Sequence, residues 1–115
     1  MRASPDLDAE IARIIFRKLV VYDSVSRTYH VSVEGAERQH ILSYSRNLVH
    51  AEEIVAKFQR DGWSFRYRKD GDGFLAGFSK SDGNAYRMYR SETLPLSICI
   101  AGLGLIHGTH IQRSS

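Results

Sequence analysis

The longest apolar run of the chain lies near its C-terminal end, at residues 94–106, and the segments before it must pack around it. Its leucines and isoleucines do not alternate with polar residues, so periodicity alone allows either a buried strand or a buried helix. Its length and the early Pro95 favour a helix, because proline is tolerated in a first helical turn. A helix that is apolar all round is buried on more than one side. We therefore expect another layer or another subunit to cover it.

As a helix, this run has a broad stripe of large residues, a stripe of small residues and a third side. The broad stripe consists of Leu96, Cys99, Ile100, Leu103 and Ile106. The small residues are Ser97, Ala101 and Gly104, which we expect to lie close to the backbone of a neighbouring element. On the third side, we expect Ile98 and Leu105 to contact a further layer or a second subunit. The second alternative predicts a homodimer.

Length and composition indicate one globular domain, since 115 residues of which 43% are hydrophobic have room for a single core. Sixteen Lys and Arg against 13 Asp and Glu give a net charge of +3, which allows an anionic partner and argues against an acidic DNA mimic. Cys99 is the only cysteine and lies in the apolar run, so we expect a core thiol in a reducing cytoplasm. The apolar run is shorter than the roughly 20 residues that span a bilayer, and the N-terminus lacks an apolar leader. We therefore expect neither secretion nor a membrane anchor.

Two earlier segments show helical periodicity. The sequence Ser-Pro-Asp at residues 4–6 provides a capping hydroxyl, a first-turn proline and an acid, and predicts a helix over residues 6–17. Its core face consists of Leu7, Ile11, Ile14 and Ile15. A second helix has Ser45 or Asn47 as its cap and ends before Gly62, which is suited to a left-handed C-terminal position. The predicted apolar stripe of this helix is Leu48, Ala51, Val55 and Phe58.

The remaining segments are rich in β-branched and aromatic residues. Strands are predicted over residues 19–22, 28–33, 63–69, 74–80 and 85–91. The first two form a hairpin with His30 toward solvent. Residues 34–40 form a surface loop, and binding residues are often found on such loops. Glycine-containing turns at residues 70–73 and 81–84 join the last three strands into a meander. We predict an α+β fold, an α/β sandwich of three helices and an antiparallel sheet of about five strands, with the C-terminal helix largely buried.

Three blocks of the sequence carry a family resemblance. They are Asp6-Leu7-Asp8-Ala9-Glu10-Ile11-Ala12, Tyr44-Ser45-Arg46-Asn47-Leu48 with Ala51-Glu52-Glu53-Ile54-Val55, and Thr93-Leu94-Pro95-Leu96-Ser97-Ile98-Cys99-Ile100-Ala101. In this order they resemble the phage ABA sandwich domain proteins, most specifically in the last block. There the family typically has an acidic residue and threonine before Pro-Leu-Ala-Ile-Cys, whereas this chain has Ser97 in place of the alanine and Glu92 near the acid. Residues 15–17 and 23–41 depart from the family pattern.

The resemblance covers about residues 6–106, so we expect a single domain over residues 1–106 and a polar tail over residues 107–115. It implies an α/β sandwich and a bacteriophage or prophage origin. It carries no catalytic residues that can be transferred to this chain.

The search for catalytic motifs is mostly negative. His107 and His110 form a close pair in the expected tail, but a metal site normally needs three or four ligands on ordered backbone. No nucleophile-elbow, Walker or dinucleotide-binding motif is present. A dyad of Cys99 and a histidine would require the thiol to leave a buried helix. We therefore predict no catalytic, metal or cofactor site.

The positive signal is a basic patch on the last three strands. Its residues are Arg66, Arg68, Lys69, Arg87, Tyr89 and Arg90. Guanidinium groups beside an aromatic ring suit phosphate and base contacts, and they suit a protein partner as well. The alternative is that these residues have no binding role, because the solvated face of an antiparallel sheet carries Arg and Lys in any case.

Three hypotheses of function follow. The first is a small non-enzymatic phage or prophage accessory protein in the host cytoplasm, which binds and modulates a host protein and inhibits a defence system such as CRISPR–Cas. The second is a nucleic-acid-binding module that uses the basic sheet face. The third is an enzyme without a recognised motif, which requires a deep pocket with converging titratable groups.

Overall fold

The computed structural model describes residues 1–35, 37–80 and 87–114, with side chains up to residue 107 at the C-terminal end. The helices are α1 (Pro5–Ile14), α2 (Leu48–Arg60) and α3 (Leu94–Ser114). The strands are β1 (Leu19–Asp23), β2 (Thr28–Ser32), β3 (Gln39–His40), β4 (Trp63–Asp70), β5 (Gly73–Lys80) and β6 (Arg87–Ser91). The predicted turn at residues 81–84 and the start of the predicted last strand lie outside the described residues.

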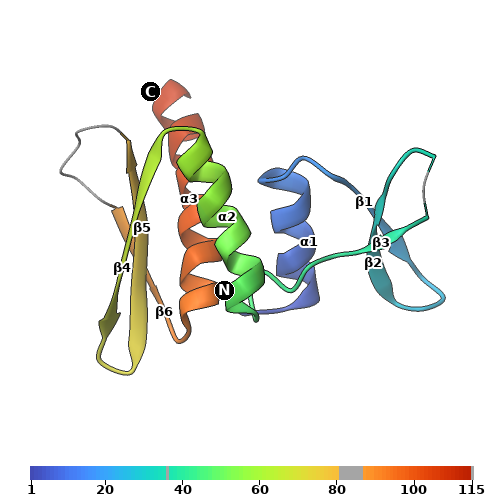
Figure 1. Cartoon of the computed structure of the whole chain (residues 1–115), viewed down its shortest axis with the longest axis horizontal. Helices are drawn as coiled ribbons and strands as arrows, with labels where there is room; N and C mark the ends of the chain where they lie inside the picture. The colour runs from blue at the N-terminus through green and yellow to red at the C-terminus, as the bar shows by residue number, and fades with distance from the viewer. Residues whose placement is uncertain (36, 81–86, 115) are drawn as a thin grey trace.

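The strands form two three-stranded antiparallel sheets, in the orders β1-β2-β3 and β4-β5-β6. Figure 1 shows the two sheets at opposite ends of the molecule, with α3 and α2 beside the β4-β5-β6 sheet and α1 beside the β1-β2-β3 sheet. The predicted α+β sandwich is confirmed. The prediction of one sheet of about five strands is wrong, because the free edge of β2 pairs with β3 and α1 packs against the hairpin. β3 itself arises from the end of the segment that we expected to be a loop.

α1 begins where the sequence predicts and ends earlier. The Ser4 hydroxyl accepts a hydrogen bond from the Leu7 N–H at 3.1 Å, so Ser4 caps the helix. The helix stops at Ile14 rather than residue 17 because Arg17 adopts a left-handed φ of 52° and the Lys18 N–H bonds back to the Ala12 carbonyl at 2.9 Å. This closing turn directs the chain into β1.

The ends of α2 follow local signals. The Asn47 side chain accepts hydrogen bonds from the N–H groups of Val49 and His50, which decides between the two predicted caps. Gly62, with a φ of 94°, follows the last turn as expected. The stripe that faces the core is Ala51, Ile54 and Phe58. Leu48, predicted in that stripe, is instead 41% exposed.

α3 packs its small residues against the β4-β5-β6 sheet. The Ser97 hydroxyl donates a hydrogen bond to the Phe74 carbonyl at 2.9 Å, and a Cβ built on Gly104 would overlap the ring of Tyr89. The close approach to a neighbouring backbone is therefore confirmed for Ser97, whereas Gly104 lies against a side chain, and Ala101 between them is buried. The backbone of residues 107–114, expected as a polar tail, continues the helix.

Candidate functional site

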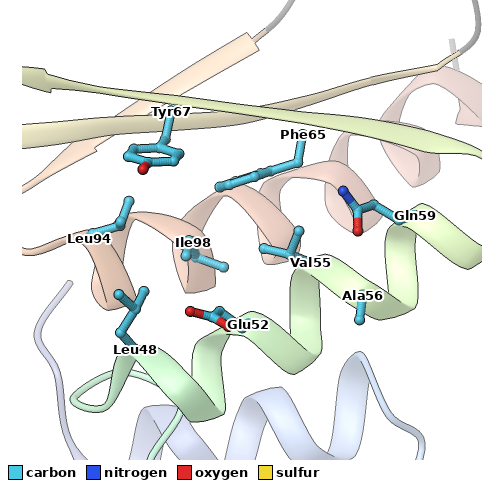
Figure 2. Close-up of a pocket in the computed structure, with 9 residues that line it drawn as sticks. All are labelled: Leu48, Glu52, Val55, Ala56, Gln59, Phe65, Tyr67, Leu94 and Ile98. Carbon is cyan, nitrogen blue, oxygen red and sulfur yellow. The ribbon is translucent and has the colours of Figure 1, made fainter.

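A groove of about 400 Å³ lies between α2, the start of α3 and the inner face of β4 (Figure 2). Its lining residues are Leu48, Glu52, Val55, Ala56, Gln59, Phe65, Tyr67, Leu94 and Ile98. Most of them are apolar, and a volume of this size falls within the range of binding pockets. This groove is the candidate functional site.

One face of α2 forms a wall of the groove. The residues that it contributes are Leu48, Glu52, Val55, Ala56 and Gln59. They recur every three or four positions, so they lie in one row along the helix. The core-facing row is a different one, and α2 therefore carries two apolar rows instead of one. The second row is partly open to solvent, because Leu48, Glu52 and Gln59 are exposed.

β4 forms the opposite wall through the alternation of its side chains. Phe65 and Tyr67 point to the groove, while Arg66 between them points to the other face. Phe65 also contacts the Phe78 ring in the core, with ring centroids 5.2 Å apart. Tyr67 is 55% exposed, so an aromatic ring with a polar hydroxyl stands at the rim.

The floor of the groove comes from α3. Ile98 is 1% exposed within the single chain, so its burial between α2 and the sheet is complete without a second subunit. This position agrees with the predicted further layer and gives no support to the homodimer alternative at Ile98. Leu105 is half-buried and packs against the core.

Glu52 is the charged residue of the lining, and Figure 2 shows its side chain at the middle of the α2 wall. It is exposed and forms no ion pair within the described part of the chain. Its neighbour Glu53, also exposed, is not part of the lining. The groove therefore offers apolar contact with one carboxylate available to a cation.

The register of the β4-β5-β6 sheet divides the predicted basic patch. Arg66 lies in line with Gly77 and Met88, and Arg68 lies in line with Leu75 and Arg90. Residues in line across a sheet share a face, so Arg66, Arg68 and Arg90 lie on the outer face, which no helix covers in Figure 1.

The other three patch residues belong to the inner face. Tyr89 pairs with Ala76, Arg87 pairs with Phe78 and Lys69 pairs with Phe74, all on the side toward the helices. The six residues thus form no single surface, because Lys69 alternates with Arg68 along β4 and because the odd-numbered residues of β6 face inward. On the outer face, Arg90 is already paired with Asp70 at 3.1 Å and with Asp72 at 2.9 Å.

The four histidines whose side chains are described and the cysteine do not line the groove. The His30 and His40 rings lie 5.5 Å apart across β2 and β3, and His50 accepts a hydrogen bond from the Ser43 N–H at 2.9 Å. Among side chains that the structure describes, no three or more His, Cys, Asp or Glu residues are placed to hold a metal ion. The His110 side chain lies outside the described residues. Cys99 is fully buried, and burial raises the pKa of its thiol.

Sequence reasoning missed the groove because it assigned Leu48 and Val55 to the core row. The sequence signal that could have revealed the groove was the width of the apolar surface of α2. Ala51, Ile54 and Phe58 already complete a core-facing row, so Leu48, Val55 and Ala56 form a second one.

Comparisons with known proteins identify a family and a similar fold. A family model, the phage ABA sandwich domain, matches residues 9–103. The structure is similar to the 2.0 Å crystal structure of a phage protein from Bacillus cereus ATCC 14579, with a TM-score of 0.70 and 24% sequence identity over 90% of each chain. The comparison with curated proteins gave no match. Over the described residues, no helix has both the length and the apolar character needed to cross a membrane.

Proposed function

The chain belongs to the phage ABA sandwich domain family, and from this premise we propose that it is a small non-enzymatic accessory protein of a phage or prophage. In this proposal it acts in the cytoplasm of the bacterial host, where it binds and modulates a host protein. A component of a defence system such as a CRISPR–Cas effector is the class of partner that we favour. The phage family of the chain supports this choice.

The observation that carries the proposal is the groove between α2 and β4. Its apolar surface is in part open to water, and Leu48 and Tyr67 leave large apolar groups exposed at its rim. Contiguous exposed apolar surface is characteristic of binding sites for other macromolecules or ligands. The polar groups of the lining are the Glu52 carboxylate, the Gln59 amide and the Tyr67 hydroxyl, and they suit recognition of a polar partner group within an apolar surface.

The outer sheet face supports nucleic-acid binding less well. Arg66, Arg68 and Arg90 do share that face, but the two aspartates beside Arg90 offset its charge. Phosphate binding depends on cations that are available to the backbone of the nucleic acid. Unchanged mobility of RNA and DNA fragments with the protein at low salt would remove this alternative.

Affinity capture from a lysate of the bacterial host tests the proposed function with two neighbouring variants. Leu48 lines the groove, whereas Val49 is 71% exposed on the same first turn of α2 and lies outside it. Both sites are near the helix N-terminus, so glutamate has a similar effect on the helix at each. We expect a stoichiometric host protein to be recovered with the wild type and Val49→Glu and lost with Leu48→Glu. Recovery of no such protein, or equal recovery with both variants, contradicts the proposal.

A further inference from the structure

β4 is an edge strand, which pairs with β5 along its whole length on one side and with no described strand on the other. All eight of its residues, Trp63–Asp70, are in register with β5, and β4 is the first strand in the order β4-β5-β6. An antiparallel strand directs the N–H and C=O groups of alternate residues to opposite sides. Half of the peptide groups of β4 therefore point to an edge where, within the described residues, no strand follows.

The groove opens along this same edge. In Figure 2, β4 runs above the opening and α2 runs below it, with α3 behind. The groove-lining row of α2 extends from Leu48 to Gln59, which is about 16 Å at the rise of an α-helix. About five residues of an extended chain cover that length. The backbone groups at the β4 edge and the apolar wall of α2 thus border the same groove, whose length matches that of a short strand.

Resting on the proposed function, we propose that the groove binds an extended segment of the partner protein, which adds to β4 as a further strand. Backbone hydrogen bonds to the β4 edge hold the segment, and its alternate side chains enter the groove, as in β-augmentation. Apolar side chains contact Phe65, Tyr67 and Val55, which are half-buried or exposed. A Lys or Arg side chain on the same side of the segment meets the carboxylate of Glu52, which has no ion pair among the described residues.

The charges of β4 disfavour a second copy of this chain as the occupant. Arg66 and Arg68 lie on the outer face of the strand, and Lys69 comes next on its inner face. Antiparallel pairing of two β4 strands would bring the cations of both copies next to each other, and like charges on paired strands are destabilising. The proposed segment therefore belongs to a different protein, with a cation on its groove side.

Synthetic peptides test this proposal directly with the full chain. The peptide is a blocked octapeptide of alternating valine and threonine, with lysine in place of one central valine. Two N-methylated forms carry methyl groups on alternate amides, one form for each register. Strand addition predicts that one form weakens binding at least about tenfold, because its blocked amides face β4, and that the other binds nearly as the parent does. Equal affinity of all three, or equal loss in both forms, overturns the backbone pairing.

The role of Glu52 is tested by charge exchange, with Glu53→Lys as the matched control outside the lining. We expect Glu52→Lys to weaken binding of the lysine peptide about three- to fivefold and to improve binding of the peptide with glutamate at that place. Glu53→Lys should change both affinities by less than half as much. Identical effects of the two variants overturn the assignment of the cation to the groove.

The two proposals fail in different ways. If host-protein capture depends on Leu48 while no peptide binds, the proposed function stands and strand addition is overturned. If the peptides bind in the predicted register while no host protein is captured, strand addition is supported and the proposed function is contradicted. Amide hydrogen exchange supplies an independent readout, since strand addition should protect alternate β4 amides only.

Discussion

The carboxylate of Asp8 accepts two hydrogen bonds from Ser45, one from the backbone N–H at 2.8 Å and one from the hydroxyl at 2.7 Å. Both residues are buried, and the other oxygen of Asp8 lies 3.0 Å from the guanidinium of Arg46. Asp8 belongs to the first of the family-like blocks, and Ser45 and Arg46 belong to the second. This contact ties α1 to the turn before α2, so these blocks meet in a structural contact away from the groove.

Removing the Asp8 carboxylate should destabilise the fold. Asp8→Ala leaves the buried N–H of Ser45 without its acceptor and the Ser45 hydroxyl with only the Ser4 carbonyl at 3.5 Å, and we expect a loss of about 2–4 kcal/mol in the free energy of unfolding. Asp8→Asn keeps an acceptor oxygen and should lose about half as much. Arg46→Ala removes a half-exposed partner and should cost at most about 1 kcal/mol. Urea denaturation of the three variants measures this order, and equal stabilities of Asp8→Ala and Arg46→Ala would contradict it.

A second prediction concerns the glycines of α3. A Cβ on Gly102 would lie 2.9 Å from Ile15 Cδ1, 3.1 Å from Ile54 Cγ2 and 3.3 Å from a ring carbon of Phe58, all in the core between the helices. A Cβ on Gly104 would meet one side chain, that of Tyr89, which is half-buried at the border of the core.

Alanine gains about 1 kcal/mol of helix propensity at either glycine, so the difference between the two variants reports packing alone. We expect Gly102→Ala to be less stable than Gly104→Ala by about 1–2 kcal/mol, because overpacking a closed core forces its neighbours to shift. Thermal unfolding of the pair measures this difference. A Gly102→Ala variant at least as stable as Gly104→Ala would show that the helices have room to separate.

What could be predicted from the sequence depended on how local the signal was. The caps Ser4 and Asn47 and the left-handed Gly62 each act within a few residues, and all three take the predicted places. Ser97 of α3 also makes the predicted close approach to a backbone, and Gly104 lies on the same helix face but against the side chain of Tyr89. Local capping and helical periodicity are properties of a single segment.

The pairing of strands that lie apart in the sequence was harder to predict from the sequence. The two-residue strand Gln39–His40 has no period of its own, yet it decides that the hairpin closes a separate sheet. The placement of the arginines of β6 in the basic patch could not be predicted for a similar reason. Only the register of β6 determines whether Arg87 or Arg90 lies on the face of Arg66 and Arg68. A shift of one residue moves every side chain of a strand to the other face. No local feature of the β6 sequence specifies that choice.

Cys99 should be chemically inert in the folded protein. It is fully buried, and burial, followed by the nearby charge of Asp8, raises the pKa of its thiol. The thiolate is the reactive form, so a raised pKa and the lack of solvent access both suppress reaction. We expect no labelling by a thiol-reactive disulfide reagent under native conditions and one equivalent on unfolding in denaturant. Rapid labelling of the native protein would show that α3 separates from the core.

The last prediction concerns alkaline pH and Tyr44. Burial, with smaller contributions from the charges of Glu53 and Asp8, raises the pKa of Tyr44 from 10.0 to about 12. The folded state then holds this proton in a range where the unfolded state releases it. The contribution of Tyr44 to stability is full below pH 10 and is lost as the pH rises through about 12.

Tyr44→Phe isolates this effect, because phenylalanine keeps the ring that stacks on Phe16 at a centroid distance of 5.2 Å and removes the titrating hydroxyl. Between neutral pH and pH 11 or above, the wild type should lose more of its free energy of unfolding than the variant does. Denaturant titrations of both proteins across this range measure the difference, and tyrosinate absorbance identifies the late ionisation. Parallel stability curves would show that the hydroxyl of Tyr44 is solvated in the folded state, in spite of the position of its ring between α1 and α2.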